Sequence, residues 1–114
     1  MPTVNVYYKS KSDLASLNRI VPRLQTYLAD RLTCGEIKLR QDEVSVRLIP
    51  VQGRGMLGHV EVDITAHEFP DRVKNQDKIC FDTKAWLEQE TKSIKDVRVW
   101  LRLCQLGHDV LPQT

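Results

Sequence analysis

The chain has 114 residues, of which 41% are hydrophobic and 28% are charged, and its formal net charge is +2. This length supports one hydrophobic core and not two, so we expect a single domain over residues 1–114. The nearly balanced charge gives no case for a nucleic-acid partner, and no apolar run reaches the roughly 18 residues of a membrane span.

Alternation over the first eight residues predicts a β-strand with one buried face. Val4, Val6 and Tyr8 occupy one parity of this run. Removal of Met1 would make the nitrogen of Pro2 a basic secondary amine. An unperturbed α-amino group titrates near pH ~7.7–8.0, and burial would lower this value towards neutrality. Pro2 is therefore a candidate general base, although many proteins begin with Met-Pro and have no such chemistry.

Two later stretches have the spacing of helices. The first carries an apolar stripe at intervals of three and four residues, formed by Leu14, Leu17, Val21, Leu24, Leu28 and Leu32. Ser12 or Asp13 would cap this helix, and Pro22 would kink it. The second helix would begin near Pro70, with a less regular apolar face that includes Val73, Cys80, Thr83 and Leu87.

Three further stretches alternate as strands do, at 44–51, 59–67 and 96–104. The glycine-rich stretch 52–58 lies between the first two of them. Its spacing Gly53-x-Gly55-x-x-Gly58 formally fits a dinucleotide-binding fingerprint, but no helix follows it, so we interpret it as a loop.

The resulting element order, β-α-β-β-α-β, predicts an α/β (α+β) fold. We expect a two-layer sandwich with a four-stranded sheet and two helices on one of its faces. The other face of the sheet would then expose Tyr7, Ile49 and Trp100 among charged residues. Such a face often contacts another subunit, so we expect a homo-oligomer.

Three features together resemble the tautomerase superfamily: Met1-Pro2 before an alternating strand, Val21-Pro22 in the first helix, and Pro70-Asp71-Arg72 at the start of the second. In the pattern of its sequence the chain is most similar to the 5-carboxymethyl-2-hydroxymuconate isomerases. The likeness extends over nearly the whole chain, although Pro50 and the 53–58 loop do not match the isomerase pattern cleanly. The resemblance implies a tautomerase-like fold built from β-α-β units, and a homo-oligomer in which a trimer is favoured.

The resemblance also implies an activity, that of a cofactor-independent tautomerase or isomerase acting on a carboxylate-bearing keto–enol acid. Pro2 would be the catalytic base that moves a proton between two carbons or between oxygen and carbon. Arginines would bind the carboxylate and stabilise enolate charge, because a guanidinium can meet a carboxylate through two parallel hydrogen bonds. Arg47 on the second strand matches the family pattern best, followed by Arg72 and then Arg40.

Other interpretations of these residues remain open. Each of the three arginines could be a solvated charge, and a tautomerase fold could lack activity. A non-catalytic, ferredoxin-like binding module would instead use Arg98, Trp100 and Arg102 on the last strand, where Trp100 could also be buried between subunits.

Neither the histidines nor the cysteines indicate a metal site or a nucleophile. His59 and His67 share a strand face, but at ~3.4 Å per residue they would be ~27 Å apart, too far to bind one ion. The cysteines, which lack close spacing, are Cys34, Cys80 and Cys104. We expect them to be free thiols in a cytoplasmic protein, and we expect no metal and no cofactor.

Overall fold

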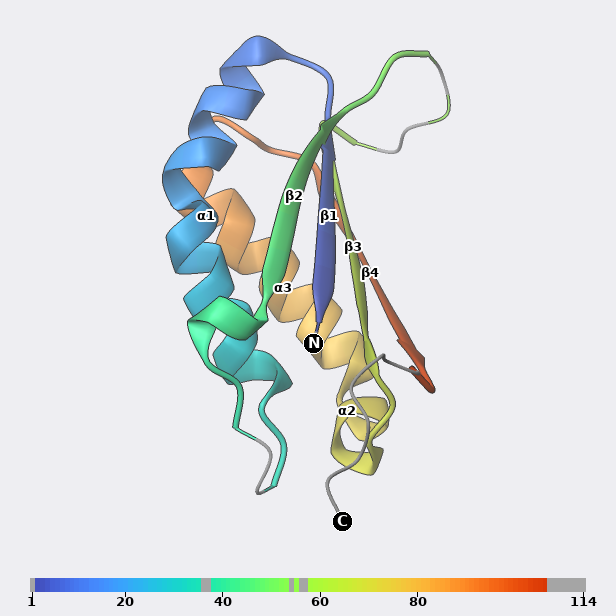
Figure 1. The fold of residues 1–114 in the computed structure, drawn as a ribbon. Helices are drawn as coiled ribbons and strands as arrows, with labels where there is room; N and C mark the ends of the chain where they lie inside the picture. Colours follow the sequence, from blue (N-terminus) through green and yellow to red (C-terminus); the bar gives the residue numbers. More distant parts are fainter. Residues whose placement is uncertain (1, 36–37, 54, 56–57, 107–114) are drawn as a thin grey trace.

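The computed structural model describes residues 2–35, 38–53, 55 and 58–106. The sheet carries its helices on one face, in two layers (Figure 1). Its strands are β1 (Thr3–Tyr8), β2 (Ser45–Pro50), β3 (Val60–His67) and β4 (Val97–Cys104). The helical elements are α1 (Lys11–Leu32), the 3-10 helix η1 (Gln41–Glu43), α2 (Pro70–Lys74) and α3 (Gln76–Thr91). The predicted fold class is confirmed.

The sheet has the strand order β2-β1-β3-β4, so that β1 and β3 are central and β2 and β4 are edges. Two parallel pairs, β1 with β2 and β3 with β4, meet where β1 and β3 run antiparallel. Each parallel pair is joined by a helical crossover, as parallel strands require. Thr3 lies opposite both Ser45 and Thr65, so the start of β1 is at the end of β3.

The core lies between the sheet and the helices, as the alternation predicts. Val4 and Val6 of β1 are fully buried, and so are the even-numbered residues of β3, namely Val60, Val62, Ile64 and Ala66. In α1, Leu17 and Leu28 of the predicted stripe are buried, whereas Val21 is half-buried and Ile20 takes its place. Each fully buried side chain of this size stabilises the fold by about 1.5–3 kcal/mol.

The N-terminus of α1 differs from the prediction. The N-cap is Ser10, whose Oγ accepts a hydrogen bond from the backbone N–H of Asp13 at 3.1 Å, so the helix begins two or three residues earlier than expected from a cap at Ser12 or Asp13. The helix continues through Pro22 as one element. The carbonyl of Pro22 accepts hydrogen bonds from the side chains of Thr26 and Gln41, at 3.2 and 3.1 Å.

The second predicted helix is two helices, which meet at Asn75. Asn75 has φ −105° and ψ 13°, outside the helical range, and it ends α2 and begins α3. The prediction that Val73 faces the core is wrong, because its side chain is 47% exposed. Arg72 is buried in its place, with 3% exposure.

The predicted loop at 52–58 includes residues 54, 56 and 57, which lie outside the described part of the chain, and the rest of it is neither helix nor strand. The free, half-buried cysteines are Cys34, Cys80 and Cys104. Among the described residues, no helix combines the length and apolarity needed to cross a membrane.

Candidate functional site

Pro2 is buried at the end of the sheet, immediately before β1. Its carbonyl accepts a hydrogen bond from the backbone N–H of Ser45 at 3.1 Å, which fixes it beside the start of β2. Its parity is that of Val4, so its ring is on the helix-covered face of the sheet. Continuing the β1–β3 register by one residue places Pro2 opposite Ala66.

Arg72 lies at the same end of the sheet and is bound there by backbone carbonyls. Its Nε donates to the carbonyl of Leu32 at 2.9 Å, and one terminal nitrogen donates to the carbonyl of His67 at 2.8 Å. The guanidinium also stacks over Phe69, with Cζ 4.9 Å from the ring centroid. Arg72 therefore joins the end of α1 to the end of β3. Its partner on β3, His67, is one residue beyond Ala66, which lies opposite Pro2.

The burial of Arg72 has an electrostatic consequence. Removal from water lowers the pKa of its guanidinium from the usual range, and the nearby Cys34 acts in the opposite direction. Arginine stays charged despite such shifts, so a fixed positive charge lies at the Pro2 end of the sheet.

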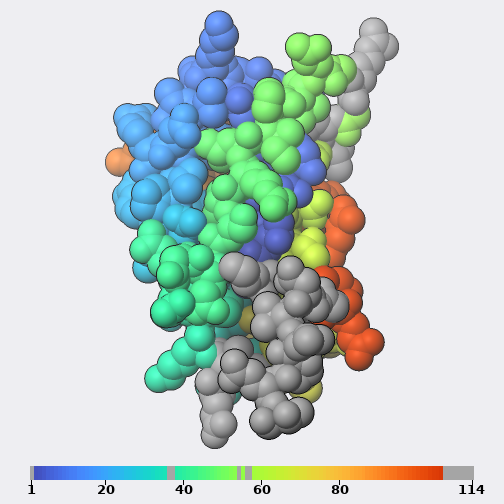
Figure 2. Space-filling model, in the orientation of Figure 1, coloured from blue at the N-terminus to red at the C-terminus, as the bar shows by residue number. Residues whose placement is uncertain are grey.

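Arg40 is at this end too, but it is exposed. It precedes η1, and its Nε lies 3.3 Å from the Asp42 carboxylate and 3.5 Å from that of Glu43. Its side chain is 77% exposed, so water and these two acids screen its charge. In Figure 2 the green segment that contains η1 and β2 runs along the surface beside the blue α1.

Arg47 lies on the opposite face of the sheet from the Pro2 ring. It pairs with Asn5 in the β1–β2 register, and its parity places it on the face that carries no helices. The structure thus brings Pro2, Arg72 and Arg40 to one end of the sheet and does not bring Arg47 to that site within one chain.

The uncovered face carries a polar row that the sequence analysis did not identify. Asp63 lies opposite Asn5 on one side and Trp100 on the other. One carboxylate oxygen of Asp63 accepts from Arg102 at 3.0 Å. Its other oxygen and Oδ1 of Asn5 are buried and have no hydrogen-bond partner within the described residues. The parity of the strands could have placed these side chains together, but only the register shows that they are neighbours.

His67 contacts residues of its own chain. Nδ1 of His67 accepts from the backbone N–H of Leu106 at 3.3 Å, and the ring lies 4.7 Å from that of Phe69. Within the residues that the structure describes, no three His, Cys, Asp or Glu side chains gather closely enough to bind a metal ion.

A scan of family models and a search of curated proteins find no match to this sequence. Solved structures do match over most of the chain. A macrophage migration inhibitory factor-like protein from Entamoeba histolytica is 11% identical, with a TM-score of 0.62 over 95% of each chain. A member of the cis-3-chloroacrylic acid dehalogenase family is 10% identical, with a TM-score of 0.61 over 97% of this chain and 84% of that one.

A third similar structure, a fused 4-OT described as a symmetric trimer, is 12% identical, with a TM-score of 0.58 over 90% of this chain and 85% of that one. These three proteins belong to the tautomerase superfamily. The chain therefore has the tautomerase fold, and the likeness to that fold predicted from sequence is confirmed.

Proposed function

We propose that this chain is a cofactor-independent tautomerase or isomerase acting on a carboxylate-bearing keto–enol acid, with Pro2 as its base once Met1 has been removed. One observation carries the proposal: Pro2 is buried before the central strand of a tautomerase fold, on its helix side. We also propose that the protein is cytoplasmic, as its free cysteines suggest.

The chemistry requires one proton acceptor and one fixed cation. The Pro2 nitrogen takes a proton from the enol oxygen or from the carbon beside the carbonyl, and returns it to the other atom. The electron pair moves through the conjugated system, so the product is an isomer, and no electrons are gained or lost. This is why the reaction needs no redox cofactor. Negative charge that develops on the enolate oxygen is stabilised by a preorganised cation.

The three arginines have different parts in this proposal. Arg72 supplies the fixed cation, through its field and the N–H groups not bonded to carbonyls. Arg40 is exposed and can turn towards a substrate carboxylate at the same end of the sheet. Arg47 is on the uncovered face, so it would bind substrate at the Pro2 site of a neighbouring subunit and not at that of its own chain.

We further propose a homo-oligomer, with a trimer favoured. The uncovered face supports this, because Trp100 is 49% exposed there and two buried polar oxygens lack partners within the described residues. A related fold, the fused 4-OT, is described as a symmetric trimer.

The first test is the intact mass of the native protein, followed by ketonisation of phenylenolpyruvate by the wild type and by Pro2→Ala. We expect a mass lacking Met1 and a loss of activity of roughly a hundredfold or more, within the range that a general base contributes. The matched control is Thr3→Ser at the neighbouring position, which should keep its activity. Retention of Met1, or equal activity of Pro2→Ala, would refute the catalytic proposal.

A second experiment separates the arginines. Arg40→Ala and Arg47→Ala are both exposed changes, so their effects on kcat/KM report on substrate contacts rather than on folding. For Arg72 we use Arg72→Lys and compare kcat/KM with the free energy of unfolding. A loss of activity without loss of folded protein supports its role as the cation.

The alternative is a non-catalytic binding module. The exposure of Trp100 between Arg98 and Arg102 favours it, because these side chains form a cationic aromatic surface on the uncovered face. If Met1 is retained and no ketonisation is found, binding at that surface becomes the better account.

A further inference from the structure

A cavity of about 240 Å³ lies between residues 16–23 of α1 and the end of α3. The end of α3 leads to the start of β4, which lies at the opposite end of the sheet from Pro2, so the cavity is separate from the Pro2 site (Figure 1). The volume is below the roughly 300–1,000 Å³ of pockets for drug-sized ligands, but several times the ~30 Å³ share of one water molecule. The cavity therefore has room for a small ion or for one group of a larger molecule.

Positive charge is in excess around this cavity. Its cationic lining residues are Arg19 and Arg23 on α1 and Lys92 directly after α3. Glu90 is the one acid among the described residues that line it, and its Oε2 is 2.7 Å from a terminal nitrogen of Arg23, so these two charges balance. Arg19 and Lys92 have no acidic partner in the part of the chain that the structure describes. The excess of two positive charges is as large as the formal net charge of the whole chain, +2.

The helices themselves account for only one of these cations. A cation at a helix C-terminus is favoured by the helix dipole, which explains Lys92 at the end of α3. Arg19 is inside α1, away from both of its ends, where the dipole contributes little. Arg19 and Arg23 are also four residues apart on one helix, a spacing at which like charges repel. An anion in the cavity would offset this repulsion.

A buried hydroxyl on the wall of the cavity anchors Arg19. Ser16 is 7% exposed, and its Oγ accepts a hydrogen bond from a terminal nitrogen of Arg19 at 3.4 Å. The same Oγ is 3.2 Å from Oγ of Ser93, which donates to the carbonyl of Thr91 at 3.1 Å. This chain of hydrogen bonds links the guanidinium to the end of α3. It uses one N–H group of Arg19, so the others remain available to a ligand.

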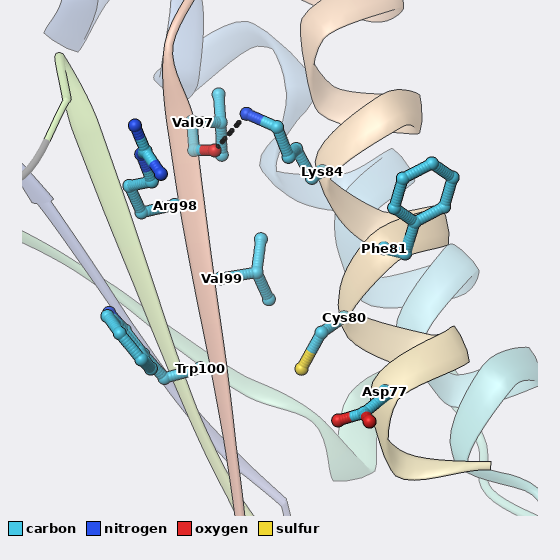
Figure 3. Close-up of a pocket in the computed structure, with 8 residues that line it drawn as sticks. All are labelled: Asp77, Cys80, Phe81, Lys84, Val97, Arg98, Val99 and Trp100. Atoms are coloured by element: carbon cyan, nitrogen blue, oxygen red, sulfur yellow. Dashed lines mark hydrogen bonds between the residues drawn. The ribbon is translucent and has the colours of Figure 1, made fainter.

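A larger cavity, of about 310 Å³ between α3 and β4, differs in how its cations are used. Figure 3 shows Lys84 bonded to the carbonyl of Val97, and Arg98 on the other side of the strand. Lys84 also pairs with Glu88 at 2.8 Å, and Arg98 pairs with Asp96 at 3.2 Å. Both cations are therefore already bound within the chain, and charge selects no anion there.

We propose that the cavity between α1 and α3 binds a phosphate group, either of free inorganic phosphate or of a small phosphate monoester, with Arg19 and Lys92 as its charged donors. A phosphate group carries about −1.5 to −2 charges at pH 7, so it balances both unpaired cations. A carboxylate balances only one of them. The guanidinium can meet two phosphate oxygens through parallel hydrogen bonds, while the ammonium acts as a point charge. Because both cations are exposed, we expect a dissociation constant of about 1 mM.

The test titrates the native protein with inorganic phosphate at constant ionic strength and follows the NMR signals of the Arg19 side chain and the Lys92 amide. We expect saturable shifts at both residues. Arg19→Gln and Lys92→Gln should each weaken binding at least threefold. The matched control is Lys74→Gln, which removes an exposed cation from α2, outside the cavity, and should leave binding unchanged. Absence of saturable shifts, or equal weakening by Lys74→Gln, would overturn the proposal, because net charge alone would then explain the attraction.

The charge of the ligand is tested with pH and with other anions. Phosphate should bind at least threefold more tightly at pH ~7.5 than at pH ~5, because its second pKa is about 6. Sulfate, a dianion at both pH values, should bind equally at both and controls for changes in the protein. A phosphate affinity that does not change with pH, or acetate binding as tightly as phosphate at pH ~7.5, would contradict recognition of a dianion.

Glycerol 1-phosphate distinguishes the two sources of the phosphate group. Tighter binding than that of inorganic phosphate, lost in Arg19→Gln, assigns the site to phosphate monoesters. Weaker binding assigns it to the free ion.

Discussion

The Arg72 guanidinium donates to the backbone carbonyl of Leu32, joining α2 to the last turn of α1 across 40 residues of sequence. This carbonyl belongs to the end of a helix, where the last four have no partner within the helix. A second bond, to the carbonyl of His67, brings in the end of β3. One buried cation thus satisfies backbone acceptors from two elements that meet beside Pro2.

We predict that Arg72→Ala lowers the free energy of unfolding by about 2–4 kcal/mol, because two buried carbonyls lose a charged donor. Arg72→Lys should have an intermediate effect, since an ammonium lacks the planar fork that reaches both carbonyls. Urea unfolding measures this. The control is Arg31→Ala, an exposed arginine paired with Asp82, which should cost less than about 1 kcal/mol. Equal costs would contradict the bridging role.

Glu88 should contribute to stability in a pH-dependent way. Its hydrogen bond with Lys84 lowers the pKa of its carboxyl, burial opposes this, and the N–H of Val97 adds to it. Because the pKa is lower in the folded state, the ionised carboxyl stabilises the protein at pH values above its unfolded-state pKa. This stabilisation is lost as the pH falls through the folded-state pKa. We expect Glu88→Gln to cost about 1 kcal/mol at pH 7, and the difference from wild type to disappear at acid pH. Glu90→Gln, which removes a surface pair with Arg23, is the comparison.

Gly58 should resist substitution because of a close backbone approach. Its φ is +74°, and an added Cβ would lie 2.5 Å from the carbonyl oxygen of Asp96. That oxygen already accepts the N–H of His59 at 2.8 Å, so it cannot move freely. We predict that Gly58→Ala costs about 2–3 kcal/mol, through strain and displacement of this contact. Gly55→Ala, at φ +93° and with no atom of the described residues within 4 Å of the added Cβ, should cost only the backbone strain, about 1 kcal/mol. Thermal unfolding of the two variants separates these contributions.

Two exposed aromatics on opposite sides of the sheet test the assembly. Trp100 is on the uncovered face and Phe81 is on α3. We predict that Trp100→Glu yields monomers in light scattering, because it places a charge where subunits would meet, and that Phe81→Glu leaves the oligomer intact. A monomeric wild type would contradict the proposed oligomer directly.

The sequence alone was enough for the architecture, because period-two alternation and a helical stripe are local signals. All four strands lie within the predicted stretches, and the faces assigned to Val4 and Val62 are correct. The break at Asn75 was not predicted, because Val73 and Cys80 are seven residues apart, which is the spacing of two turns of one continuous helix.

The candidate site was less predictable, because its contacts join distant segments. Arg72 could have been placed inside, since it shares a helical spacing with Ile79 and Thr83, both buried. Its partners could not have been found, because Leu32 lies far away in sequence and offers only a backbone carbonyl. The hydrogen bond from Lys84 to the carbonyl of Val97 on β4 depends likewise on how α3 lies along the strand.

The central position of β1 has a consequence for how the chain is made. β1 leaves the ribosome first, yet both its neighbours, β2 and β3, are synthesised later, and β3 ends only at His67. Until then its apolar face has no complete sheet to join, so the nascent chain carries an exposed strand while all the residues from β1 to the end of β3 are made. Formation of the sheet must therefore wait for β3, and fragments that stop before β3 are expected to be targets of chaperones and proteases.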